Sequence, residues 1–98
     1  MSGMNRHDFV FTIGYDGSTA IVDRKTQRKY RNATAAQLLA AGLYRQAFCA
    51  ALFDDQLQDF VAEFRDATGI AVADADAIKR LFGVFDVPDS VKNIMAVG

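Results

Sequence analysis

Apolar and polar residues alternate most clearly over residues 8–23, and this alternation predicts a β-hairpin. Asp16 and Gly17 separate two runs rich in β-branched and aromatic residues. Asp-Gly is favoured in two-residue type I′ turns because both turn positions need a positive φ. With that turn Tyr15 lies opposite Ser18, and one face of the ribbon collects the expected core residues, namely Phe9, Phe11, Ile13, Tyr15, Ala20 and Val22. A two-stranded ribbon is marginal alone, so we expect it to pack on the rest of the chain.

The period changes from two to that of a helix after residue 33. Thr34 and Gln37 have the spacing of a capping box, which predicts a helix start. Apolar residues recur at helical spacing over residues 44–52 and again over residues 57–64, and a helix over the second stretch is expected to run to Gly69. Asp74 is placed to cap one more helix, with three residues expected to point inward, namely Ile78, Leu81 and Phe82. Residues 88–98 fit either a helical turn after a proline or a strand, and the pattern leaves both open.

These elements predict an α+β fold, in which an N-terminal β-hairpin or three-stranded antiparallel meander packs against three to four α-helices. The chain has 98 residues, of which 51% are hydrophobic and 23% are charged, a composition typical of a globular protein. We therefore expect a single domain over residues 1–98, with residues 1–7 flexible.

The charged residues are distributed unevenly. Residues 1–49 have a net charge of +4 and residues 50–98 a net charge of −5. Most of the positive charge lies in "DRKTQRKYRN", a basic strip made of Arg24, Lys25, Arg28, Lys29, Tyr30 and Arg31. We interpret RKTQ as a turn and RKY as a short third strand, where cations would protect a sheet edge from aggregation. Two functional alternatives remain open for the strip, nucleic-acid binding with Tyr30 as a stacking residue and docking of an acidic protein.

Few residues are suited to catalysis. His7 is the one histidine and Cys49 the one cysteine, too few for a zinc site, and Cys49 is expected to be a buried, inert thiol. Clustered aspartates such as Asp54 and Asp74 are explained as helix caps. No catalytic residue, metal ligand or cofactor is therefore assigned, and we expect a protein that is not an enzyme.

The stretch "IGYDGST", Ile13 to Thr19, resembles the first phosphate-binding loop of the actin and sugar-kinase ATPases. It lacks the residue that this family has between Asp and Gly, and the family encloses its nucleotide between two lobes larger than this chain. A small enzyme or nucleotide binder is accordingly the third functional alternative.

An apolar segment follows the last strongly amphipathic helix, and it contains Val84, Phe85 and Val87. If exposed, these side chains would form a protein interface. The leading hypothesis is a non-enzymatic protein–protein interaction or self-associating module, with an unknown protein or a second copy as partner and nucleic acid as the alternative. The N-terminal residues lack an apolar signal sequence and no apolar run has the length of a membrane span, so we expect a cytoplasmic location without membrane contact.

Overall fold

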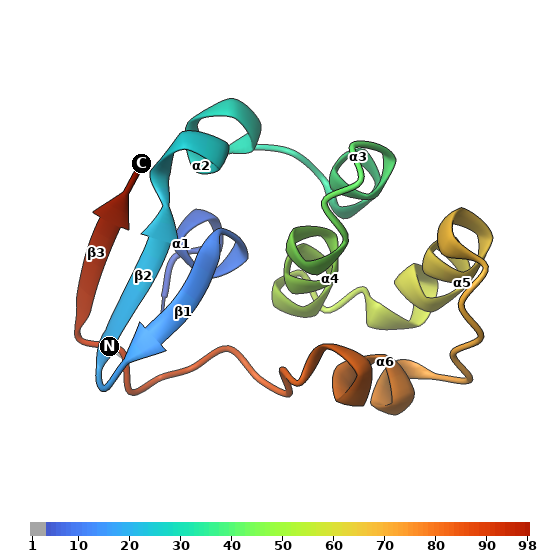
Figure 1. The fold of residues 1–98 in the computed structure, drawn as a ribbon. Helices are drawn as coiled ribbons and strands as arrows, with labels where there is room; N and C mark the ends of the chain where they lie inside the picture. Colours follow the sequence, from blue (N-terminus) through green and yellow to red (C-terminus); the bar gives the residue numbers. More distant parts are fainter. Residues whose placement is uncertain (1–3) are drawn as a thin grey trace. The chain divides into compact units, whose positions relative to one another are not determined.

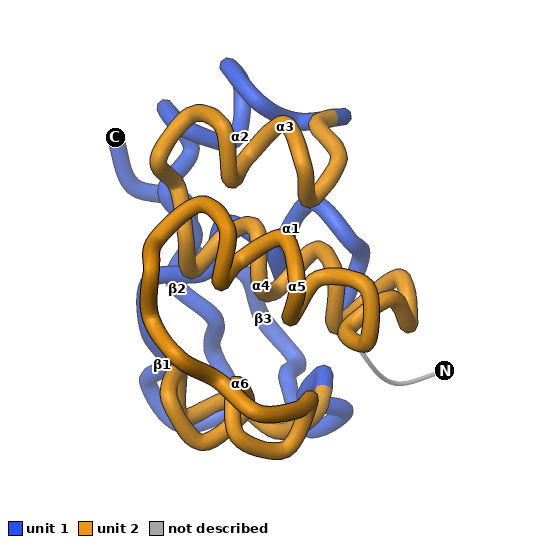
Figure 2. The backbone as a smooth tube through the Cα atoms, turned by 90° about the vertical axis from the view of Figure 1, so that its right-hand side faces the viewer, with its two compact units in different colours: residues 1–32, 87–98 blue, residues 33–86 orange. Residues whose placement is uncertain are grey.

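The computed structural model describes residues 4–98, and these form two compact units. One unit contains the described residues up to Asn32 together with Val87–Gly98, and the other is Ala33–Asp86 (Figure 2). The second unit is thus an insertion, in chain order, between two parts of the first. The single domain expected over residues 1–98 stays a prediction. Of the terminus expected to be flexible, residues 1–3 lie outside the described part of the chain, and Met4 is buried.

The first unit contains a three-stranded mixed sheet in the order β1-β2-β3 (Figure 1). Strands β1 and β2 are antiparallel and β3 is parallel to β2. Its elements in chain order are α1 (Arg6–Val10), β1 (Thr12–Asp16), β2 (Thr19–Asp23), α2 (Arg24–Tyr30) and β3 (Asn93–Val97). The α+β class and the N-terminal hairpin are therefore confirmed, and of the two alternatives for residues 88–98 the strand is observed. The antiparallel meander is wrong, because the third strand comes from the other end of the chain and is parallel.

The hairpin turn differs from the sequence prediction. Asp16 pairs with Thr19, so the two turn residues are Gly17 and Ser18 rather than Asp16 and Gly17. Only Gly17 of this turn has a positive φ, +60°. A glycine at the first turn position fits a type II′ turn, whereas type I′ needs a positive φ at both positions. Tyr15 consequently lies opposite Ala20 instead of Ser18.

The first strand is also shorter than predicted, and it is irregular. Helix α1 precedes it, and the register shifts between Thr12 and Gly14, which places Thr12 opposite Val22. Such a bulge changes which residues face the core. Phe9, Phe11, Ala20 and Val22 are buried as predicted, together with Val10 and Thr12, whereas Ile13 and Tyr15 are exposed.

The second unit is helical. Among its residues the structure forms four helices, α3 (Ala35–Ala40), α4 (Tyr44–Phe53), α5 (Leu57–Thr68) and α6 (Ala75–Phe82). With α1 and α2 the described residues form six helices, more than the three to four expected. The capping box is confirmed, because the Gln37 N–H donates to the Thr34 hydroxyl at 3.1 Å and the Thr34 N–H to the Gln37 amide oxygen at 2.8 Å.

Aromatic rings form the interior of this helical unit. Phe48 stacks on Phe82 with ring centroids 4.7 Å apart, and Phe82 meets Phe64 edge-on at 5.6 Å. Helix α6 begins as predicted, with the Asp74 carboxylate accepting from the Ala77 N–H at 2.9 Å. Of its three residues expected to point inward, Ile78 is buried and Phe82 half-buried, but Leu81 is exposed. Leu81, three residues after Ile78, lies at the margin of the apolar face of this helix, and half of its surface is exposed to solvent.

Candidate functional site

Strand β3 is an unusual edge strand, because all five of its residues are exposed. Ile94, Met95 and Val97 expose 41%, 47% and 39% of their surface, respectively. The strand pairs with β2 along one side, from Thr19 opposite Asn93 to Asp23 opposite Val97. No other strand within residues 4–98 pairs with its second side (Figure 1). The result is an apolar strand with one free edge.

Proteins usually protect such an edge. Charged side chains, proline, a bulge or a very short strand prevent a second strand from pairing with the free backbone groups. The five residues of β3 include no charge and no proline, and their ladder with β2 is regular. The free side of β3 is therefore able to accept another strand.

The basic strip is a helix, and the predicted turn and third strand at this position are wrong. Asp23 caps α2 by accepting from the Thr26 N–H at 3.2 Å and from the Thr26 hydroxyl at 2.7 Å. These hydrogen bonds, chiefly the one from the hydroxyl, lower the pKa of the Asp23 carboxyl below its ordinary value. The cap therefore stabilises the fold above the ordinary pKa of Asp23 and is lost as the pH falls through the lowered pKa. An aspartate three residues before a threonine, followed by good helix formers, is the sequence signal for this helix.

The helix places the basic residues of the strip in different environments. Lys25, Arg28 and Lys29 are exposed and have the i, i+3, i+4 spacing of one helical face. Arg24 and Tyr30 are half-buried, and the Lys29 ammonium lies 5.4 Å from the centre of the Tyr30 ring. Lys25, Arg28 and Lys29 form a compact basic face, whereas Tyr30 is engaged by a cation within its own helix.

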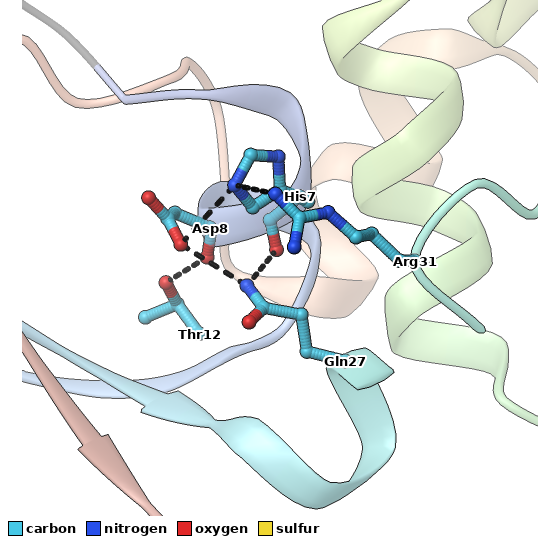
Figure 3. A network of polar contacts seen from close by, with 5 residues as sticks. All are labelled: His7, Asp8, Thr12, Gln27 and Arg31. Carbon is cyan, nitrogen blue, oxygen red and sulfur yellow. Dashed lines mark hydrogen bonds and ion pairs between the residues drawn. The ribbon is translucent and has the colours of Figure 1, made fainter. Parts of the chain in front are cut away.

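A network of polar contacts fixes α2 to α1 (Figure 3). The buried Gln27 side chain donates from Nε2 to the His7 carbonyl and to Asp8 Oδ1, both at 3.0 Å. The Thr12 hydroxyl donates to the Asp8 carbonyl at 2.6 Å. No buried side-chain polar atom among the described residues is left without a hydrogen bond. These contacts explain why a glutamine is tolerated in the interior.

Arg31 extends this network to the surface. Its Nη2 lies 3.4 Å from His7 Nε2, and His7 Nε2 lies 3.9 Å from Asp8 Oδ1. A guanidinium only donates, so His7 Nε2 would be the acceptor of any hydrogen bond between them. Arg31 thus differs from the three cations of the basic face, since it contacts α1.

The predicted apolar segment lies where the two units join along the chain. Phe85 exposes 53% of its surface, and Val84 and Val87 are half-buried. Val84 and Phe85 belong to the helical unit and Val87 to the sheet unit. An interface at these three residues stays a prediction.

The described residues offer little support for a reactive thiol or a metal site. Cys49 is buried, as expected, and burial raises the pKa of its thiol to about 11, which keeps it protonated and unreactive at neutral pH. Within residues 4–98 no three His, Cys, Asp or Glu side chains are grouped so that they could hold a metal ion. In the same residues, no helix has both the length and the apolar character of a membrane span.

Comparison with known proteins provides no template for function, since no protein-family model, curated protein or solved structure matches the chain. The features that remain are the free edge of β3 and the basic face of α2. Sequence reasoning found the cations but gave them the wrong local structure, and it did not identify β3 as a surface. The available signal was the uncharged run Ile94–Met95–Ala96–Val97, which is typical of a strand.

Proposed function

We propose that this protein is a non-enzymatic protein-interaction module of the cytoplasm that binds an extended segment along the free edge of β3. The observation that carries the proposal is the exposure of an uncharged, unprotected edge strand. Adding a strand to such an edge joins backbone N–H and C=O groups in new hydrogen bonds, and alternate side chains provide selectivity. The apolar side chains Ile94, Met95 and Val97 would lose their exposure to water in the complex.

Photocrosslinking from the strand tests this proposal. With p-benzoylphenylalanine in place of Met95 of the full chain, illumination of the producing cells is expected to attach the protein covalently to a partner protein chain. The same amino acid at Gln58, which is exposed on α5, is the matched control and is expected to give no such product.

A second substitution links any product to strand addition. Ala96→Pro removes a backbone donor from the strand and is expected to abolish the product formed at position 95. Identical products from positions 95 and 58, or no product from position 95, would contradict the proposal.

The second candidate function is nucleic-acid binding by the basic face, and one specific observation favours it. Lys25, Arg28 and Lys29 lie exposed on the same side of α2, so they are able to contact successive phosphates. The net charge of +4 over residues 1–49, which include this helix, agrees with an anionic partner.

Nucleic-acid binding has a defined salt dependence. Three phosphate contacts predict that log K falls with log salt with a slope of about −2.7 on duplex DNA and about −2.1 on single strands. Replacing Lys25, Arg28 and Lys29 with glutamine is expected to remove that slope in a salt-titrated shift assay, and Arg80→Gln on α6 is the control. Absence of binding in about 50 mM salt, or binding that the triple substitution leaves unchanged, excludes this function.

A further inference from the structure

The free edge of β3 is suited to one partner in particular. We infer that two copies of this chain associate through antiparallel pairing of their β3 strands, which joins the two sheets into one of six strands. The inference rests on the proposed function and specifies its partner. It follows from the direction of the backbone groups, the side chains of the strand and the position of the basic helix.

The backbone groups on the free side belong to two residues. The Asn93 N–H donates to the Ser18 carbonyl at 3.3 Å, so Asn93 directs its backbone groups toward β2. Successive residues of a strand direct these groups to opposite sides. Met95 and Val97 therefore also face β2, and Ile94 and Ala96 face the free edge.

One two-fold symmetric register pairs the free backbone groups of Ile94 and Ala96 entirely with β3 residues of the second copy. If the axis passes through Met95, then Ile94 lies opposite Ala96 of the second copy and Ala96 opposite its Ile94, and each pair exchanges two hydrogen bonds. Registers centred on Ile94 or Ala96 would pair the other residue with Lys92 or Gly98, which lie outside β3. The Lys92 N–H already donates to the Ser18 carbonyl at 2.8 Å.

The side chains of β3 are compatible with their own copy in this register. Met95 lies opposite Met95 of the second copy, Ile94 opposite Ala96, and Asn93 opposite Val97. Residues directly opposite one another share a face, so the exposed apolar side chains cover each other and no like charges meet. The strand also has no charge by which it would select an acidic or basic foreign segment.

The basic helix favours the antiparallel arrangement. A Cβ on Gly98 would lie 3.5 Å from the Lys25 Cβ, so the start of α2 lies at the Gly98 end of β3. Antiparallel pairing about Met95 separates the two Gly98 ends by six residues, about 20 Å at about 3.4 Å per residue. This separation exceeds the Debye length of about 8–10 Å in physiological salt. Parallel pairing would instead place the two positive helices next to each other.

Disulfide trapping of the full chain tests the register. In the proposed dimer the two copies of residue 95 form a pair without backbone hydrogen bonds, with Cα atoms about 4.5 Å apart, which a disulfide can bridge. The two copies of residue 93 are about 14 Å apart along the strands, which it cannot. Mild oxidation should therefore convert most of Met95→Cys into a covalent dimer and leave Asn93→Cys monomeric. Cys49 does not compete, because its thiol is buried.

The mass in solution provides a second measurement. Sedimentation equilibrium of the unmodified chain should give a mass approaching twice 10.7 kDa as concentration rises. Ala96→Pro should stay monomeric while keeping its circular dichroism spectrum, because its N–H faces away from β2 and proline is tolerated at such edge positions.

The results that overturn self-pairing differ from those that overturn the proposed function. Equal disulfide formation by Met95→Cys and Asn93→Cys, or a monomer mass at every concentration, excludes the antiparallel dimer. If photocrosslinking from position 95 still captures a different protein in an Ala96-dependent manner, the interaction module stands and its partner is foreign. If position 95 gives neither a disulfide dimer nor a photoproduct, both proposals fail.

Discussion

Replacing Phe48 with alanine is expected to lower the free energy of unfolding by about 3–5 kcal/mol, the range for removing a fully buried phenylalanine. Phe48 is 0% exposed on α4, and its ring stacks on Phe82 at an interplanar angle of 17°. The substitution removes this contact and leaves a cavity beside the other rings of the helical unit. Domains are stable by only about 5–15 kcal/mol, so a large part of the stability is at risk. Urea denaturation followed by circular dichroism measures the change.

Phe53→Ala is the matched control for this substitution. Phe53 lies at the end of the same helix and is 37% exposed. Its truncation therefore removes less buried apolar surface and leaves a smaller cavity. It is expected to cost less than half as much as Phe48→Ala. Equal losses from both substitutions would show that the aromatic interior does not stabilise the helical unit as described.

Gln27→Leu is expected to cost about 2–3 kcal/mol, although leucine is similar in size and more apolar. Gln27 is 1% exposed, and its amide donates to the His7 carbonyl and the Asp8 carboxylate. Leucine has no donor, so both acceptors lose a hydrogen bond where α2 contacts α1. Hydrogen bonds to charged groups are worth more than neutral ones, which places the cost above that of an ordinary hydrogen bond.

Arg28→Leu separates this effect from helix propensity. Arg28 follows Gln27 on α2 and is exposed, and leucine and arginine have similar helix propensities. Its substitution is expected to change the free energy of unfolding by less than about 0.5 kcal/mol, as for most surface changes. If Gln27→Leu were neutral or stabilising in urea titrations, the polar network of Figure 3 would not be holding α2 in place.

The helices after residue 33 were predictable because their signals are local. A capping box at Thr34, a glycine at position 69 and a capping aspartate at position 74 each act within one helical turn, and each helix end is observed where its signal predicted it. The same kind of signal was present at Asp23, but the basic residues after it were interpreted as a turn followed by a short edge strand. The cap at Asp23 determined that this segment is a helix, and the basic residues are therefore placed on that helix.

The candidate site was less predictable. The cations of the basic face were identified from the sequence, but which of them share a face depended on the helix that carries them. Gln27 has no sequence signal, because its burial depends on the backbone of His7, twenty residues away.

The sequence by itself determined the local elements of this protein: the hairpin, the helices of residues 33–86 and the uneven distribution of charge. Periodicity, caps and turns act between residues close in the chain, so they can be identified without the fold. Only the tertiary structure decided the place of β3, which pairs with residues more than seventy positions earlier. An apolar run such as residues 94–97 is equally suited to a core, and exposure is decided by which strand it pairs with and which side is left open. The free edge on which the proposed function depends is therefore a property of the sheet.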